Sequence, residues 1–313
     1  MKKKIIIIVG PTASGKTELS IKLAKAFNGE IINADSTQIF EGTDIATNKI
    51  TKKEMLGIQH HLLSIKKIYE SYSVANFQKD SRLIIDQIWN RNKVPIVVGG
   101  TGLYISALLL KYSFTPYKHN MDFVDEYNHL NSKEIWNILN KKDSESAQKI
   151  HFNNRYRILR ALEIIKTSGQ KKSKIIEHDK QFYYNEDEFI IIGLKPNRNQ
   201  LYERINARVL SLVENGLFEE IKTAYYNCQK RITQALQCIG GKEIIMYENK
   251  EISYDKCVDL MQKNNRHYAR RQFTWFKNQL KTSIWFNYDF KNFQDTCKEI
   301  EEFLKTYIST KTI

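Results

Sequence analysis

An octapeptide close to the N-terminus constrains the fold of this chain more than any other feature. Residues 10–17 read Gly-Pro-Thr-Ala-Ser-Gly-Lys-Thr and match the pattern G-x-x-x-x-G-K-[ST]. The apolar run at residues 4–9 predicts a buried strand before it, and residues 16–27 predict a helix after it. A glycine-rich turn in this position points backbone N–H groups, and the positive end of the helix dipole, at a phosphate. The octapeptide is therefore a predicted phosphate-binding loop.

The loop predicts how a diphosphate or a triphosphate is held, but it does not specify ATP hydrolysis. Lys16 supplies a positive charge, and the hydroxyl of Thr17 is a predicted ligand of Mg²⁺. The remaining residues of the predicted phosphate site are Gly10, Pro11, Thr12, Ala13, Ser14 and Gly15.

Strand and helix patterns alternate beyond the loop. Strands are predicted at residues 30–33 and 94–98, with a helix over residues 74–90 between them. The apolar residues of that helix that follow a period of 3.6 are Phe77, Leu83, Ile84 and Ile88. The alternation predicts an α/β fold, with a parallel sheet flanked by helices as in P-loop NTPases.

A change of composition after Pro116 predicts a second domain. The sequence becomes polar, rich in Lys and Asn, and helical in pattern, so residues 116–184 form a predicted helical insertion. The catalytic core then combines residues 1–115 with 185–313. In the second part of this core, residues 189–194 predict a further strand, and residues 198–228 and 254–280 predict long amphipathic helices.

Charge and composition narrow the class of partner. The chain of 313 residues has 49 Lys and Arg against 35 Asp and Glu, a net charge of +14, which attracts polyanions. No apolar run approaches the roughly 18 residues of a membrane span. The four cysteines show neither a C-x-x-C pair nor a regular spacing with histidines, so they predict free thiols in a reducing cytoplasm rather than a zinc site or disulfides.

Polar residues follow two of the predicted strands, at the sheet edge where such folds bind ligands. Asp35 follows the second strand, and Gln38 is spaced to reach the same crevice with an amide that can pair with a base edge. Gly99 and Gly100 permit a close approach beside the hydroxyl of Thr101. Taken alone, Asp35 is also compatible with a helix cap, and the glycine segment with a plain strand-to-helix turn.

Eight short segments occur in an order and approximate spacing that is found in one known family. They are residues 10–17, Asp35-Ser-Thr-Gln38, His60-His61-Leu-Leu63, residues 72–77, residues 98–104, Arg160-Ala-Leu-Glu163, Gly240-Gly-Lys-Glu243 and Arg270-Arg-Gln-Phe-Thr-Trp275. On these segments the chain resembles the bacterial tRNA dimethylallyltransferases. The resemblance implies a P-loop-type core and a helical insertion that grips the anticodon stem-loop.

The resemblance also implies a reaction. A dimethylallyl group moves from dimethylallyl diphosphate to N6 of the adenosine 3′ of the anticodon, in tRNAs that read codons starting with U. The exocyclic amine is a poor nucleophile, so Asp35 is the predicted general base. Lys16 and Mg²⁺ on Thr17 would neutralise the leaving diphosphate, and Thr101 would hydrogen-bond the bridging oxygen of the breaking bond.

Contacts to tRNA are predicted in both domains. The base leaves its stack to reach Asp35, so flipping is expected. Basic helix faces are predicted to follow the phosphate backbone. The predicted tRNA-binding residues are Asp35, Ser36, Thr37, Gln38, Thr101, Arg157, Arg160 and Arg270. Apolar candidates for the prenyl slot are residues 60–63 and 103–108, although core packing explains most of them equally well.

Departures from the family pattern concern RNA contacts more than the reaction. Gly241 stands where a tyrosine is usual, and Gln237 where some members have an arginine.

Three other functions compete with tRNA prenyl transfer. A nucleotide kinase would use the same loop for ATP, with Arg155, Arg157 and Arg160 as lid arginines. An adenylate isopentenyltransferase would prenylate a free nucleotide, against which the insertion and the positive charge argue. A non-catalytic RNA-binding protein would not need the intact Lys16, Thr17, Asp35 and Thr101. We expect a monomer in the cytoplasm, with no membrane partner.

Overall fold

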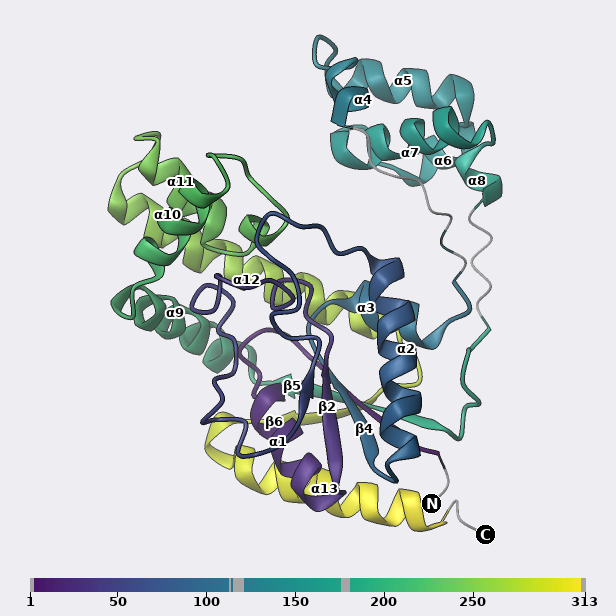
Figure 1. Ribbon diagram of the computed structural model, residues 1–313, viewed down its shortest axis with the longest axis vertical. Helices are drawn as coiled ribbons and strands as arrows, with labels where there is room; N and C mark the ends of the chain where they lie inside the picture. Colours follow the sequence, from purple (N-terminus) through teal and green to yellow (C-terminus); the bar gives the residue numbers. More distant parts are fainter. Residues whose placement is uncertain (1–2, 113, 115–120, 176–180, 311–313) are drawn as a thin grey trace. The chain divides into compact units, whose positions relative to one another are not determined.

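Figure 1 shows the computed structural model of the chain, which describes residues 3–112, 114, 121–175 and 181–310. The chain divides into two compact units. The first combines Met1–Leu109 with Phe182–Ile313, and the second is Leu110–Gln181. Within the described residues, no helix is both long enough and apolar enough to cross a membrane.

A six-stranded sheet forms the centre of the first unit. All of its pairings are parallel, and the strand order is β3-β2-β4-β1-β5-β6. The predicted α/β class is therefore confirmed. The strands are β1 (Ile5–Val9), β2 (Gly29–Asn33), β3 (His60–His61), β4 (Val94–Val98), β5 (Phe189–Pro196) and β6 (Ile284–Tyr288).

Helices cover both faces of this sheet. Successive side chains of β1 point to opposite faces, so this strand contributes apolar residues to a cluster on each side. Ile5 and Ile7 pack in one apolar cluster with α2 (Val74–Asn90), α3 (Gly102–Leu109) and the end of α12 (Tyr254–Gln279). Ile6 and Ile8 pack in a second cluster with α1 (Lys16–Ala26) and α13 (Phe293–Thr310). In Figure 1, α1 and α13 accordingly lie on the side of the sheet away from α2 and α3.

Helix α2 has the predicted bounds, and Phe77, Ile84 and Ile88 of its predicted apolar face contact the core. Its N-terminus is closed by a capping box between Ser73 and Asn76. Leu83 was predicted to be on the apolar face, and this is wrong, because its side chain is 55% exposed. The fully buried residues of α2 are Phe77, Ser81, Ile85 and Ile88. One core-facing position is therefore a small serine.

The long helix predicted over residues 198–228 is two helices. They are α9 (Arg198–Glu214) and α10 (Leu217–Asn227). The break falls at Gly216, whose φ of 94° ends the regular backbone. Helices α9, α10, α11 (Gly241–Glu248) and α12 enclose a third apolar cluster, joined by the short 3₁₀ turn η1 (Ala235–Gln237). A second such turn, η2 (Phe290–Asn292), precedes α13.

The second unit is helical and has its own core. Ile135 and Leu139 of α5 pack against Ile158 and Leu162 of α7. The helices of this unit are α4 (Met121–Asp125), α5 (Ser132–Lys142), α6 (Ser144–Lys149), α7 (Arg155–Ser168) and α8 (Lys172–Ile175). The predicted insertion, residues 116–184, overlaps this unit.

Candidate active site

The register of the sheet brings three loops to one edge. Ile8 of β1 and Asn33 of β2 are both paired with Val98 of β4. Because the strands are parallel, the segments that follow them leave the sheet at the same end. These segments are the phosphate loop, the turn with Asp35, and the turn with Thr101.

The phosphate loop has a tight backbone. Ala13 and Gly15 have positive φ angles of 62° and 82°, and a Cβ at Gly15 would lie 2.4 Å from the ring of Phe293. The hydroxyl of Tyr288 donates to the carbonyl oxygen of Ser14. The Ser14 hydroxyl is buried and has no hydrogen-bond partner within the described residues.

Lys16 is the first residue of α1, and charged side chains of both signs affect its ammonium group. Its Nζ donates to the carbonyl oxygen of Pro11 at 2.6 Å. Burial lowers the pKa of Lys16 to about 8, with the Asp35 carboxylate opposing and the Arg208 guanidinium reinforcing the shift. The ammonium group therefore lies within electrostatic range of a carboxylate and of a second cation.

Arg208 is a site residue that the sequence did not single out. It lies in α9, and its Nη1 donates to Oγ1 of Thr12 in the phosphate loop at 3.2 Å. Burial lowers its pKa, and Asp35 opposes this shift. The available signal was an arginine on the helix face that carries the buried residues Ile205 and Val209. A charge on a buried face indicates a partner inside the protein.

Asp35 is oriented by its own turn. Its Oδ1 accepts hydrogen bonds from the backbone N–H of Thr37 at 3.0 Å and from the Thr37 hydroxyl at 2.7 Å. Its backbone N–H donates to Oδ1 of Asn33 at 3.1 Å. Its Oδ2 would lie 3.7 Å from a Cβ at Gly100, and it accepts no hydrogen bond from the described residues. One carboxylate oxygen is thus held and the other is available.

Thr101 is tied to the same turn. Its Oγ1 accepts the backbone N–H of Ser36 at 2.9 Å and donates to the Ser36 hydroxyl at 3.2 Å. Its backbone N–H donates to the carbonyl oxygen of Ala34 at 3.2 Å. Burial raises the pKa of the Tyr268 phenol, in α12, far above neutral, and the nearby Asp35 carboxylate adds to the shift. Tyr268 therefore stays protonated as a neighbour of Asp35.

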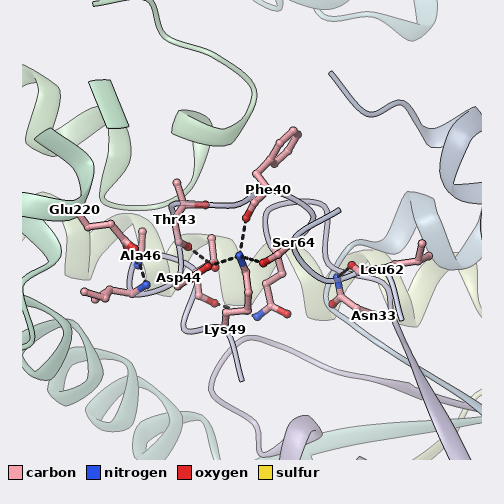
Figure 2. A network of polar contacts seen from close by, with 12 residues as sticks. Asn33, Phe40, Thr43, Asp44, Ala46, Lys49, Leu62, Ser64 and Glu220 are labelled. Carbon is pink, nitrogen blue, oxygen red and sulfur yellow. Dashed lines mark hydrogen bonds and ion pairs between the residues drawn. The ribbon is translucent and has the colours of Figure 1, made fainter. Parts of the chain in front are cut away.

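Gln38 lies in a loop that is fastened from several sides (Figure 2). Its Nε2 donates to the carbonyl oxygen of Thr47 at 3.0 Å, which leaves the side-chain oxygen as the acceptor for a ligand. Lys49 donates to the carbonyl oxygen of Phe40 within this loop and to the hydroxyl of Ser64, which follows β3. The loop is a defined structure rather than an open coil.

Apolar side chains next to the phosphate loop belong to α9, α10 and α12. The sequence did not single out these segments as candidates for a prenyl slot. Thr12 and Arg208 line a narrow cavity of about 20 Å³. Its apolar walls include Leu212 of α9, Leu217 of α10 and Met261 of α12. In contrast, Tyr104 and the residues up to Leu108 are buried in the core beneath α2.

The predicted lid arginines of the second unit differ in their surroundings. Arg155 donates to the carbonyl oxygens of Leu130 and Tyr127 at 2.6 and 2.7 Å, so its role is structural. Arg160 forms an ion pair with Glu163 at 2.5 Å, while Arg157 is exposed. Burial lowers the pKa of Lys172, and Arg157 and Arg160 add to the shift.

Helix α12 has both exposed basic and buried aromatic residues, such as Arg270 and Phe276. Gln272, however, is also buried, and it contacts both the phosphate loop and the turn with Thr101. A glutamine between Arg271 and Phe273 gives no strong signal in a sequence.

Comparison with known proteins gives consistent relatives. Residues 38–279 match the sequence profile of the IPP transferase family. A tRNA dimethylallyltransferase of Anoxybacillus flavithermus is 43% identical over 288 residues, which are 92% of this chain and 91% of the relative. One of Finegoldia magna is 42% identical over 314 residues, which are 97% of this chain and 99% of the relative.

Solved structures agree with these relatives. The tRNA isopentenylpyrophosphate transferase of Bacillus halodurans matches with a TM-score of 0.75 at 39% identity, over 99% of this chain and 98% of the other. A eukaryotic dimethylallyltransferase acting on tRNA matches with a TM-score of 0.83 at 30% identity, over 99% of this chain and 80% of the other. With a phosphate loop, a carboxylate and a hydroxyl turn at one sheet edge, and with relatives along nearly its whole length, this chain belongs to the IPP transferase family.

Proposed function

We propose that the chain is a tRNA dimethylallyltransferase, which transfers the dimethylallyl group of dimethylallyl diphosphate to N6 of the adenosine 3′ of the anticodon. Its substrates are tRNAs that read codons starting with U. One observation carries the proposal: Asp35, with a free carboxylate oxygen, is close enough to Lys16 and Arg208 to shift their pKa values, and Arg208 hydrogen-bonds to Thr12 of the phosphate loop. A diphosphate and a base that loses a proton therefore both have partners there.

The acceptor side of the reaction uses Asp35. The N6 amine forms a bond to C1 of the dimethylallyl group while the bond from C1 to the diphosphate oxygen breaks. N6 carries an extra proton as this bond forms, and Oδ2 of Asp35 accepts that proton. Thr37 holds Oδ1, so the carboxylate is already oriented. The side-chain oxygen of Gln38 is an acceptor for the second N6 proton.

The donor side neutralises the leaving diphosphate. Negative charge grows on the diphosphate as C1 leaves, and Lys16, Arg208 and the N–H groups of the loop are fixed donors for that charge. The Thr101 hydroxyl would leave Ser36 and donate to the bridging oxygen of the breaking bond. Apart from the Thr101 hydroxyl, these groups are held by the folded chain, so little reorganisation is needed during the step.

Mg²⁺ fits this site as a partner of the diphosphate rather than of a protein cage. Within the described residues, no group of three His, Cys, Asp or Glu side chains is arranged to hold a metal ion. Thr17 is exposed at the start of α1 and offers one hydroxyl oxygen. Mg²⁺ is commonly bound by few protein ligands together with substrate phosphates, and when bound it supplies charge neutralisation.

The tRNA partner would contact both units. We infer that the helical unit grips the anticodon stem-loop through the exposed Arg157 and its neighbour Arg160, and that Arg270 contributes from α12. Ser36, Thr37, Gln38 and Thr101 would surround the flipped adenine beside Asp35. A cytoplasmic location and a monomeric state are further predictions.

A labelling assay tests the proposed function. Purified protein, Mg²⁺, labelled dimethylallyl diphosphate and unmodified tRNA should give labelled RNA, and free AMP should not be labelled. Asp35→Asn should lower the transfer rate by about 10² to 10⁴, the usual contribution of a general base, while tRNA binding is kept. Transfer of label from the γ-phosphate of ATP, with none from the prenyl donor, would identify a kinase instead.

A further inference from the structure

We infer that Gln272 is a positioning residue that couples the phosphate loop to the turn carrying Thr101. The inference rests on the proposed function, since it concerns the alignment of the bound diphosphate with the Thr101 hydroxyl. Gln272 lies in α12, far from both loops in sequence, and its side chain is 5% exposed. No part of the predicted machinery includes it.

Both ends of the Gln272 amide are used, one on each loop. Its Oε1 accepts the backbone N–H of Thr12 at 2.7 Å. Its Nε2 donates to the carbonyl oxygen of Gly100 at 2.9 Å. The acceptor and the donor of an amide side chain have fixed relative positions. A movement of the phosphate loop is therefore transmitted to the residue next to Thr101.

Gly100 indicates that the turn is shaped around this amide. Gly100 is not among the glycines with a positive φ, so its backbone conformation does not require glycine. A Cβ at this position would instead lie 2.1 Å from Nε2 of Gln272. The absence of a side chain at residue 100 thus leaves room for the hydrogen bond from Gln272.

Tyr268 precedes Gln272 by one helical turn on α12, and its phenol lies close enough to Thr101, Gln272 and Asp35 to be affected by them. The same face of the helix therefore lies beside both loops. Both polar atoms of the Gln272 side chain are used by Thr12 and Gly100, so its effect on the reaction would pass through these two residues.

A turnover experiment tests this path. Gln272→Met keeps the volume of the side chain but removes both hydrogen bonds, and kcat should fall about tenfold to a hundredfold, with KM for tRNA changed by about twofold or less. Gly100→Ala should give the same split while residue 272 stays glutamine, because the added Cβ would displace the Gln272 amide. Gln279→Met, at the exposed end of the same helix, is the matched control and should keep the wild-type kcat.

A double substitution distinguishes coupling from general damage. In a Thr101→Val background, Gln272→Met should lower kcat by only about twofold, because effects that share one path are not additive. The same fold loss in both backgrounds would overturn the inference, as would wild-type turnover by Gln272→Met.

Amide hydrogen exchange provides a measurement that needs no turnover. Inorganic pyrophosphate with Mg²⁺ should slow exchange in the wild-type protein in residues 10–17 and also in residues 99–104. In Gln272→Met, pyrophosphate should slow exchange in residues 10–17 alone. Protection of both segments in the variant, or of the first alone in the wild type, would contradict the coupling. Lack of prenyl transfer by the wild type would count against the proposed function only.

Discussion

At the scale of single residues, Glu30 is a buried carboxylate that three cationic or ring N–H donors keep ionised. Its side chain in β2 is 4% exposed, and Oε2 lies 2.7 Å from Nη2 of Arg91 and 2.8 Å from Nε2 of His61. Nζ of Lys93 lies 3.0 Å from Oε1. Burial opposes ionisation, but the hydrogen bonds from Arg91, His61 and Lys93 outweigh it and lower the pKa of Glu30 to about 2.

The Glu30 cluster predicts a pH-dependent stability. A carboxyl with a lowered folded-state pKa stabilises the protein above its unfolded value of 4.5, and this contribution is lost as the pH falls towards about 2. Glu30→Gln should lower the free energy of unfolding at pH 7 by about 3 kcal/mol, and by much less near pH 2.5. Urea unfolding at both pH values measures this. Glu145→Gln, in an exposed pair, should change it by less than about 0.5 kcal/mol. An equal Glu30 effect at both pH values would disprove the linkage.

Lys16 makes diphosphate binding depend on pH on the alkaline side. Its pKa of about 8 means that the ammonium charge is present below that pH and is lost above it. The affinity for pyrophosphate should therefore fall as the pH rises from 7 to 9, which calorimetric titration can follow. Lys16→Met should weaken binding at pH 7 and remove most of the decline. Lys25→Met, on the exposed side of α1, should keep the wild-type profile, and a decline that survives in Lys16→Met must come from another group.

At the scale of elements, α10 fastens the loop that carries Gln38. The carboxylate of Glu220 accepts the backbone N–H groups of Ile45 and Ala46 at 2.8 and 2.9 Å (Figure 2). The next residue along the loop, Thr47, accepts the side-chain N–H of Gln38. Burial raises the pKa of Glu220, and the backbone donors oppose this shift. A helix more than 170 residues away in sequence thus orients the predicted base-contacting amide.

Removing this anchor should affect tRNA more than the donor. Glu220→Ala leaves two buried N–H groups unpaired, at a cost of about 1–3 kcal/mol each, so the loop should open locally. We expect KM for tRNA to rise severalfold while pyrophosphate affinity is unchanged, as measured by steady-state kinetics and calorimetry. Glu219→Ala alters the exposed neighbour and should be silent. Equal losses for tRNA and pyrophosphate would indicate global unfolding instead.

At the scale of the whole molecule, the net charge of +14 predicts strongly salt-dependent binding of RNA. Arg157 is exposed on α7 of the helical unit, and its neighbour Arg160 is partly neutralised by Glu163. Arg157→Ala should therefore reduce the slope of log affinity against log salt by about 0.7–0.9, the value for one phosphate contact. Filter binding at several salt concentrations measures the slope. Lys298→Ala, exposed on α13, should leave the slope unchanged. An unchanged slope for Arg157→Ala would place this face in solvent.

The local sequence pattern predicted the bounds of elements with strong signals. It did not predict features that depend on tertiary packing. The bounds of α2 were predicted because a capping box and an apolar period mark them, yet Leu83 was placed on the wrong face. The apolar face of a helix is predicted from residue types alone. Ser81 is small and polar, so the pattern did not assign it to the core although it is buried. The break at Gly216 was missed because one glycine does not interrupt the apolar pattern of α9 and α10. Strand β3 has two residues and is too short for any periodicity.

The sequence by itself determined the phosphate loop, the parallel sheet and the family, because glycine spacing, apolar runs and motif order are properties of neighbouring residues. It also placed Asp35 and Thr101 after strands that end at one edge of the sheet. Only the tertiary structure decided the partners of these groups. Arg208 reaches Thr12 from α9, and Gln272 reaches it from α12. Such contacts join residues that are far apart in the chain, and they arise when helices pack on the sheet, which no local pattern encodes.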